Sequence, residues 1–316
     1  MMALLIGCGT QGEEPNNSIS NEGEEASPAD VVDEGAEAFP ITITDDAGRE
    51  VTIDSEPKSI VSIQTSNTEI LFALGAGDRI IGVSDYDNYP EEVKDIQKVG
   101  GQDMDAELVL TLLPDMAFVT DYHYQNHADT LKQYEEAGID VIVTGSAASF
   151  DDVYQTIEML GKATGTTEKA AEITEGMKQR LDEIKEQAKA ITDKKKVWVE
   201  VSPAPDIFTT GQGTFMHEML EAIQAINVAG DQEGWVKLTE EEIVQLHPDV
   251  IITTYGYYVD NPAEEVLTRE GWAEVPAVKN EQVFDVDSDT VTRTGPRLIE
   301  GVETLAKFIY PETFTE

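Results

Sequence analysis

Two acidic motifs at matching places in the chain have the chemistry to bind a basic partner. The segment Asp105–Asp115 (DAELVLTLLPD) is similar to Thr239–Asp249 (TEEEIVQLHPD), and each begins with a residue that can cap a short helix. Glu107 and Glu241 follow two positions later. A glutamate in a first helical turn gains about 0.3–1 kcal/mol from the helix dipole, so capping alone explains each acid. The match between the motifs predicts, in addition, two outward acids that a symmetric partner can grip.

The single cysteine, Cys8, predicts a lipid anchor. Leu5-Ile6-Gly7-Cys8 is typical of a bacterial lipobox, in which the chain is cut before the cysteine and its thiol is acylated. Residues 1–8 contain no Lys or Arg and are too short for a whole signal peptide. We therefore expect them to be the remainder of a longer signal segment. One cysteine also excludes an internal disulfide.

No catalytic motif is evident, and we predict that the chain is not an enzyme and carries no cofactor. A nucleophile elbow, a phosphate loop and a zinc-protease helix are all missing from the sequence, and Gly211-Gln212-Gly213 does not complete a dinucleotide fingerprint. His123 and His127 are four residues apart, but the chain has only 4 histidines. A zinc site needs several converging ligands, so solvated histidines are favoured and no metal site is predicted.

Composition narrows the class of partner. The chain has 316 residues, 40% of them hydrophobic, which is enough for real cores and leaves room for two lobes. Its net charge of −42 argues against binding to nucleic acid or to anionic lipid headgroups. No run approaches the roughly 20 apolar residues that span a bilayer. We expect a monomer that reaches a membrane only through its lipid anchor.

Strands alternate with helices after Pro57, which predicts an α/β fold with mostly parallel sheets. Residues 9–38 are acidic and poor in apolar side chains, so we expect a disordered tether, followed by a hairpin over residues 41–53. The expected organisation is an N-terminal lobe over 57–165, one long spine helix over 166–196 and a C-terminal lobe over 197–316. The strands expected in the lobes are 59–63, 79–83, 116–120, 141–143, 197–201, 250–253 and 283–286. Two similar lobes joined by one stiff helix predict a ligand cleft between them.

Local signals refine this expectation. Ser66-Asn67-Thr68-Glu69 is typical of a capping box at a helix start, and Gly75-Ala76-Gly77 should end that helix. Helices are also expected over 129–137, 214–225 and 298–309. Tyr122, His123 and Tyr124 fall in an expected polar loop after strand 116–120, where a place in the cleft is favoured over ordinary packing. For Tyr255 and the Tyr-Gly-Tyr-Tyr run that it begins, packing and ligand binding are about equally plausible.

Several short motifs together resemble one family. The motifs are Ile60-Val61-Ser62, Thr68-Glu69-Ile70-Leu71, Tyr89-Pro90, Val99-Gly100-Gly101, both Pro-Asp pairs, Pro276-Ala277-Val278-Lys279 and Gly295-Pro296-Arg297. They make residues 57–311 similar to the helix-hinged, two-lobed lipoproteins that deliver cobalamin, ferric siderophores or haem to ABC importers. The vitamin B12-binding members are the most similar. This resemblance implies an extracytoplasmic, lipid-anchored protein that hands a small metal chelate to a permease and ATPase complex. It also implies that Glu107 and Glu241 dock onto permease arginines, with Glu240 and Glu242 leaving the second register open by one residue.

The resemblance also implies a set of ligand contacts. Tyr86, Phe208 and Trp235 fall on pocket aromatics of the vitamin B12 binders, and Arg293 falls on a pocket arginine. A corrinoid needs broad apolar faces and neutral hydrogen-bonding groups, which fits these residue types. The tryptophans expected in the first lobe of some B12 binders are missing, and Gly101-Gln102 and Thr120 stand near those places.

Two other ligands stay open. A ferric catecholate siderophore is strongly anionic and should meet a cluster of Lys or Arg, for which Arg293 is the one well-placed candidate. Haem needs an axial Tyr or His, which Tyr122, His123 or Tyr124 could supply. The sequence therefore predicts a corrinoid-binding importer protein, with a ferric siderophore or haem as the alternative ligand.

Overall fold

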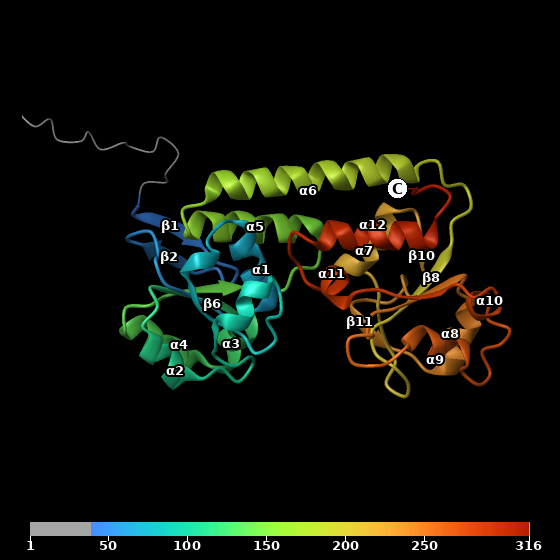
Figure 1. Cartoon of the computed structure of the whole chain (residues 1–316), viewed down its shortest axis with the longest axis horizontal. Coiled ribbons are helices and arrows are strands. Elements are labelled where there is room, and N and C mark those ends of the chain that lie inside the picture. The colour runs from blue at the N-terminus through green and yellow to red at the C-terminus, as the bar shows by residue number, and fades with distance from the viewer. Residues whose placement is uncertain (1–38, 316) are drawn as a thin grey trace, which may run out of the picture. The chain divides into compact units, whose positions relative to one another are not determined.

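The structure, a computed structural model, describes residues 39–315. The predicted lipidation site Cys8 and the predicted acidic tether lie outside the described residues. The first described element is the expected hairpin, in which β1 (Ile41–Thr44) pairs antiparallel with β2 (Glu50–Ile53). The chain after this hairpin forms a mixed α/β fold built on two parallel sheets, as the sequence predicted (Figure 1).

The first sheet contains five parallel strands in the order β5-β4-β3-β6-β7. Its strands are β3 (Ile60–Ser62), β4 (Ile80–Val83), β5 (Gln97–Lys98), β6 (Met116–Thr120) and β7 (Asp140–Thr144). The accompanying helices are α1 (Thr65–Ala73), η1 (Gly77–Arg79), η2 (Glu91–Asp95), α2 (Ala106–Leu112), α3 (Asp121–Asn126), α4 (Ala128–Glu136) and α5 (Phe150–Ala163). The predicted strand over 116–120 is confirmed to the residue.

The side chains of this sheet alternate between two separate cores, as the pleat requires. One core takes Ile60, Met116, Phe118 and Ile142, together with apolar residues of α1 and α5. The other takes Val61, Ala117, Val119 and Val141, together with residues of α2 and α4. Helices therefore cover both faces, and only the strand ends are left for a binding site.

The second sheet contains four parallel strands in the order β10-β8-β12-β13. They are β8 (Lys196–Glu200), β10 (Ile226–Asn227), β12 (Val250–Thr253) and β13 (Val283–Asp285). A separate antiparallel ribbon pairs β9 (Phe208–Thr210) with β11 (Trp235–Lys237). The helices are α7 (Phe215–Ala222), α8 (Glu240–Leu246), α9 (Pro262–Leu267), α10 (Pro276–Lys279), α11 (Ser288–Thr292) and α12 (Leu298–Ile309).

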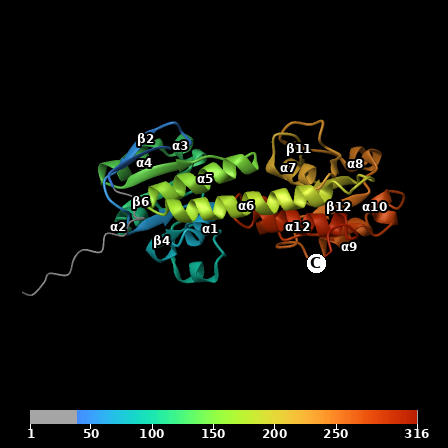
Figure 2. The same cartoon turned by 90° about the horizontal axis from the view of Figure 1, so that it is seen from above.

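One helix of 22 residues, α6 (Thr167–Ala188), joins the part of the chain that forms the first sheet to the part that forms the second. It packs beside α5 at one end and beside α7 and α12 at the other (Figures 1 and 2). The helix ends at Ala188, earlier than predicted, and the chain then runs through Thr192 and Asp193, whose side chains compete with helical hydrogen bonds. One hydrophobic core includes Ile157 of α5, Leu181 of α6, Met219 of α7 and Leu305 of α12.

Two local predictions are wrong. Helix α1 begins at Thr65 with Gln64 as its N-cap, so Ser66 and Glu69 form no capping box. The Glu69 carboxylate instead accepts hydrogen bonds from distant arginines, because two charged donors outcompete one backbone amide. The segment after β6 is the short helix α3 rather than a polar loop, and it begins there because the Thr120 side chain caps it.

Candidate ligand cleft and docking surfaces

A cavity of about 620 Å³ is lined by residues from both lobes. Its walls come from the loops after β3 and β4 in the first lobe, and from the loop after β12 and the region of α11 in the second. The lining residues are Gln64, Thr65, Ser66, Tyr86, Asn88, Tyr257, Asp287, Ser288, Asp289, Thr292, Arg293 and Thr294. Ligands of open α/β sheets bind beyond the carboxyl ends of the strands, which is where these loops lie. This cavity is the candidate ligand cleft.

Two tyrosines leave most of their surface free at this cleft. Tyr86 is 71% exposed and Tyr257 is 77% exposed, unusually high values for aromatic side chains. Tyr86 was predicted as a ligand contact, and the structure places it on the cleft wall. Tyr257 belongs to the Tyr-Gly-Tyr-Tyr run directly after the buried strand β12, for which the sequence left packing and ligand binding open. Of that run, only Tyr255 was named as a predicted contact.

The Tyr86 ring lies against the backbone of Gly101. A Cβ atom at Gly101 would come within 2.7 Å of Tyr86 Cε2, so only glycine allows this placement. The Gly101 carbonyl accepts a hydrogen bond from His123 Nε2 at 2.9 Å. Burial lowers the pKa of His123 below its ordinary value, although the hydrogen bond to Gly101 works in the opposite direction. A neutral His123 therefore supports the loop on which the Tyr86 ring rests.

The predicted pocket arginine, Arg293, lines the cleft, but other residues already occupy its guanidinium. Arg293 Nη1 donates to Glu69 Oε1 at 2.8 Å and to Asn88 Oδ1 at 2.7 Å. Its Nη2 forms an ion pair with Asp289 at 2.9 Å. Asn88 also donates to Asp289, at 3.0 Å. Arg293 therefore links the two lobes through charged contacts at the cleft wall.

The three predicted contacts on α3 do not line this cavity. His123 is buried, and its ring nitrogens bind Gly101 and Thr120, so it has no free nitrogen for a haem iron. The Tyr122 ring lies 5.8 Å from the His123 ring. Tyr124 lies under Arg49, whose guanidinium carbon is 5.3 Å from its ring centre. Tyr122 and Tyr124 keep exposed surface and remain predicted contacts for a ligand that extends past the cavity.

Phe208 and Trp235 form a second exposed aromatic surface, outside the cavity lining. In the β9–β11 ribbon Phe208 stands opposite Lys237, and Trp235 stands opposite Thr210. This register puts both aromatic residues on one face as diagonal neighbours, which are typically about 7–8 Å apart. Both side chains are exposed, so the ribbon offers a compact apolar surface. Their role in ligand binding remains a prediction.

Tyr255 is not available to a ligand in this structure. It is fully buried, and its hydroxyl donates to Glu200 Oε1 at 2.7 Å. Arg269 donates to both oxygens of the same carboxylate, at 3.1 and 2.8 Å. Burial first, and then the negative charge of Glu200, raises the pKa of Tyr255 far above its ordinary value. The prediction of Tyr255 as a ligand contact is therefore corrected: it anchors the start of the loop that carries Tyr257.

The acidic motifs form the same local structure in both lobes. Helices α2 and α8 each have 7 residues, and each ends in a left-handed residue, Leu113 (φ 47°) and His247 (φ 49°). In the second motif Glu242 accepts hydrogen bonds from Thr239 and completes a capping box. Glu107 and Glu241 are exposed, and no hydrogen bond or ion pair with another described residue engages either carboxylate. Among the three neighbouring acids, this geometry favours Glu241 as the counterpart of Glu107.

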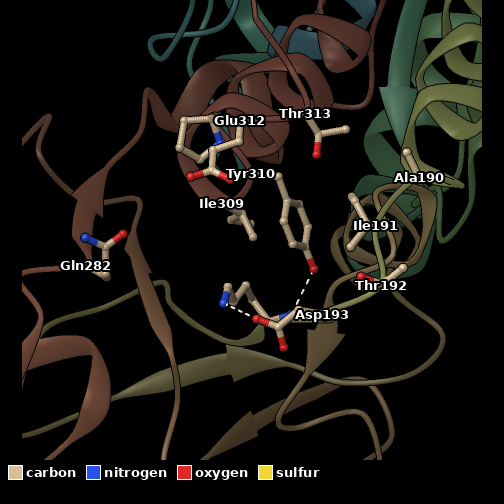
Figure 3. Close-up of a pocket in the computed structure, with 11 residues that line it drawn as sticks. Ala190, Ile191, Thr192, Asp193, Gln282, Ile309, Tyr310, Glu312 and Thr313 are labelled. Atoms are coloured by element: carbon tan, nitrogen blue, oxygen red, sulfur yellow. Dashed lines mark hydrogen bonds and ion pairs between the residues drawn. The ribbon is translucent and has the colours of Figure 1, made fainter.

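A second cavity, of about 430 Å³, lies where α6 leads into β8 (Figure 3). Tyr310 stands in its wall, where its hydroxyl accepts from the Lys195 amide at 2.9 Å and donates to the Gln224 carbonyl at 3.2 Å. Because the Tyr310 hydroxyl ties three chain segments together, we assign it a structural role.

Within residues 39–315, no group of three or more His, Cys, Asp or Glu side chains is placed to hold a metal ion. Over the same residues, no helix is both long and apolar enough to cross a membrane.

Comparisons with known proteins agree with this architecture. A family model described as periplasmic binding protein matches residues 60–290. The uncharacterized ABC transporter substrate-binding lipoprotein YvrC of Bacillus subtilis is 50% identical over 315 residues, covering 99% of this chain and 95% of that protein. The vitamin B12-binding protein of Vibrio cholerae is 26% identical over 252 residues, covering 79% of this chain and 88% of that protein.

A solved structure gives a further likeness. A possible iron-binding (periplasmic solute-binding) protein from Staphylococcus epidermidis matches with a TM-score of 0.73 at 33% identity, covering 81% of this chain and all of that one (100%). With a family match over most of the two-lobed region and no enzyme among these relatives, the chain belongs to the periplasmic binding protein family, the non-enzymatic substrate-binding proteins of ABC transporters.

Proposed function

We propose that this protein captures a corrinoid in the cleft between its lobes and delivers it to an ABC permease. The observation that carries the proposal is the pair of exposed tyrosines, Tyr86 and Tyr257, at a cavity whose one lining arginine is already paired. A corrinoid has apolar faces for aromatic contacts and edge amides for neutral hydrogen-bonding groups. Gln64, Thr65 and Asn88 supply such groups on the wall.

The likeness to the vitamin B12-binding protein of Vibrio cholerae supports the same ligand class. A corrinoid is larger than the cavity of about 620 Å³, so part of it would extend past the opening. The exposed aromatics Phe208 and Trp235, and Tyr122 and Tyr124 on α3, are the candidates to meet that part.

A ferric siderophore is the second candidate. It is favoured by the 33% identity to the possible iron-binding protein of Staphylococcus epidermidis. Against it stands the charge of the cleft, where Asp287 and Asp289 line the wall and Arg293 is engaged by carboxylates on two sides. Haem is a third candidate, for which His123 is excluded as the axial ligand because both of its ring nitrogens are occupied, and Tyr122 or Tyr124 is left for that role.

As an ABC-transporter substrate-binding protein, the chain works outside the cytoplasm with a permease and an ATPase. Acylation of Cys8 would tether it to the outer face of the membrane, and the name of its Bacillus subtilis relative, a lipoprotein, supports this. Glu107 and Glu241 would then dock onto basic sites of the permease. Their matched helices, exposure and free carboxylates support that role.

Calorimetric titration of the soluble chain with cyanocobalamin, haemin and a ferric siderophore tests the proposed ligand. We expect cyanocobalamin to bind saturably, and Tyr86→Ala or Tyr257→Ala to bind it roughly tenfold to a hundredfold more weakly, since each change removes an aromatic side chain that the ligand would bury. Ile226→Ala is the control, because Ile226 is an exposed apolar residue outside the cleft. If cyanocobalamin does not bind and a ferric chelate or haemin does, the corrinoid proposal is wrong.

A further inference from the structure

A buried carboxylate lies between two arginines at the back of the cleft. Glu69 has only 2% of its side-chain surface exposed, and its Oε1 accepts from Arg293 at 2.8 Å and from Arg297 at 2.7 Å. Its Oε2 accepts from Arg297 Nε at 2.9 Å. Glu69 belongs to α1 of the first lobe, and both arginines belong to the second lobe. The contact therefore joins the lobes and neutralises charge at the same place.

Glu69 lies just behind the ligand cleft. Arg293 lines the cleft of about 620 Å³, whereas Glu69 and Arg297 line a smaller cavity of about 340 Å³. Arg293 is the residue through which Glu69 reaches the ligand side. The smaller cavity also holds Tyr89, whose ring lies 4.0 Å from the Arg297 guanidinium carbon. Arg293 is therefore the charged residue that contacts Glu69 and also lines the cleft.

The cluster around this contact holds more carboxylates than guanidiniums. Glu69, Asp287 and Asp289 supply the negative charges, and Arg293 and Arg297 supply the positive ones. Arg293 pairs with Glu69 through Nη1 and with Asp289 through Nη2. An anionic ligand at the wall would have to displace one of these carboxylates, or meet the negative charge of Asp287, whose carboxylate accepts the backbone amide of Asp289 rather than a guanidinium.

We propose that Glu69 sets the charge selectivity of the cleft. By pairing with Arg293 and Arg297 it leaves no free cation for an anionic chelate, so the cleft accepts neutral or cationic metal chelates and rejects anionic ones. The inference rests on the proposed function only in placing a chelate in this cleft. It makes Glu69 a positioning residue, which controls the charge that Arg293 presents and does not touch the ligand.

The test compares Glu69→Gln with the unchanged chain. Glutamine keeps the shape and part of the hydrogen bonding of glutamate, but it removes one negative charge between two guanidiniums that are partly shielded from water. Attraction between a charged pair strengthens as water is excluded, so binding of an anion should respond strongly. We expect a ferric tricatecholate to bind the Glu69→Gln variant at least tenfold more tightly, and this gain to fall as salt is added.

Neutral cyanocobalamin is the second probe, and its affinity should change less than about threefold, because it has no net charge for Arg293 to attract. Glu303→Gln is the matched control: it breaks the 2.8 Å ion pair of Glu303 with Arg180, outside the cleft. Asp289→Asn is a second variant in the cleft, where it removes the other carboxylate on Arg293. We expect it to favour the tricatecholate in the same direction. If Glu69→Gln does not fold, tricatecholate binding by Asp289→Asn tests the proposal in its place.

An equal change for both probes would indicate a purely structural role for Glu69. Unchanged tricatecholate binding in both Glu69→Gln and Asp289→Asn would likewise overturn the inference, as would tight binding of that anion by the unchanged chain. Failure of the unchanged chain to bind cyanocobalamin would instead defeat the corrinoid proposal. The comparison of tricatecholate binding between the variants would still stand, so the two failures are distinguishable.

Discussion

Asp115 and Asp249 hold equivalent positions in the two lobes. Asp115 Oδ2 accepts from the backbone amides of Lys58 and Ser59 at 2.7 and 2.9 Å, and Asp249 Oδ2 accepts from the amide of Lys196 at 2.9 Å. The amide of each aspartate donates back to a carbonyl of the same segment, that of Ser59, just before β3, at 2.9 Å and that of Lys196, the first residue of β8, at 2.8 Å. Each Pro-Asp pair therefore holds the C-terminal end of its motif helix, α2 or α8, against the start of an interior strand of the sheet, β3 or β8. The two similar sequence motifs therefore make equivalent hydrogen bonds in the two lobes.

Replacing Asp115 should therefore lower stability. Asp115→Ala removes charge-assisted hydrogen bonds at a partly solvated site, so we expect a loss of about 1–2 kcal/mol in the free energy of unfolding. Burial raises the pKa of Asp115, but the hydrogen bonds from Lys58 and Ser59 outweigh it and hold the pKa below its ordinary value of 3.8. A carboxylate with a lowered folded-state pKa stabilises the fold above pH 3.8 and loses this effect as the pH falls through its folded value.

Urea unfolding at pH 7 and at pH 3 measures both effects. The difference between Asp115→Ala and the unchanged chain should shrink at pH 3. Asp182→Ala is the control, since Asp182 is an exposed aspartate of α6 with no hydrogen bond from a strand amide. Equal costs for Asp115→Ala and Asp182→Ala at pH 7 would contradict this role of Asp115.

Charge reversal at the two docking acids should abolish transport without affecting capture. Glu107→Lys combined with Glu241→Lys places two like charges against a basic partner, which costs several kcal/mol at an interface. We expect uptake of the ligand by cells to fall to background while the affinity measured by calorimetry stays unchanged. Glu158→Lys combined with Glu175→Lys makes the same change in net charge at exposed sites on α5 and α6 and should transport normally. Normal uptake by the first double variant would remove the docking assignment.

Tryptophan fluorescence can report on the β9–β11 ribbon alone. Of the 3 tryptophans, Trp235 is 56% exposed, whereas Trp198 and Trp272 are 0% and 1% exposed. Acrylamide or iodide should therefore quench Trp235 almost exclusively, and Trp235→Phe should remove most of the quenchable emission. If the ribbon meets the ligand, bound cyanocobalamin should protect Trp235 from iodide, after correction for the absorbance of the corrinoid. Unprotected Trp235 in a saturated complex would exclude the ribbon from the ligand site.

The buried carboxylate of Glu200 should be far more important for stability than its exposed neighbour. Arg269 pairs with Glu200 at 2.8 Å inside the protein and with the partly exposed Glu265 at 3.5 Å. Glu200→Ala leaves the guanidinium buried without its main partner, and we expect a cost of about 3–5 kcal/mol. Glu265→Ala, which removes a carboxylate from the same arginine, should cost less than about 1 kcal/mol. Denaturant titrations that gave equal costs for the two variants would refute this assignment.

The sequence was informative where the signal is local or repeated. The hairpin over 41–53, the strands at 116–120 and 250–253 and the last helix at 298–309 are all indicated by apolar patterning, and the structure confirms them. The equivalence of the two Pro-Asp motifs was evident from their spacing. The ion pair of Glu69 with Arg293 spans 224 residues, so no local pattern could indicate it. Glu69 was misread as part of a capping box for the same reason.

Some residues of the candidate site could be placed from the sequence and others could not, because their positions depend on contacts between distant parts of the chain. Tyr86 and Arg293 line the cleft as expected, and the family resemblance is what assigned their loops to it. Tyr255 and Tyr257 are two residues apart in one polar loop, and only the fold decides that the first is buried on Glu200 while the second faces the cleft. His123 lies under Gly101 because the Thr120 cap turns the chain into α3, which its residue types alone do not indicate.

Each lobe has a core of its own, but one further apolar core runs continuously through α5, α6, α7 and α12, so part of each lobe's interior is completed by the other. Opening one lobe would expose apolar surface of the helices that the second lobe packs against. We therefore expect the described part of the chain to melt as a single cooperative unit, although its two sheets share no strand. We then expect a solute held at the cleft to protect both lobes at once, so that a loaded molecule resists proteases along its whole folded length.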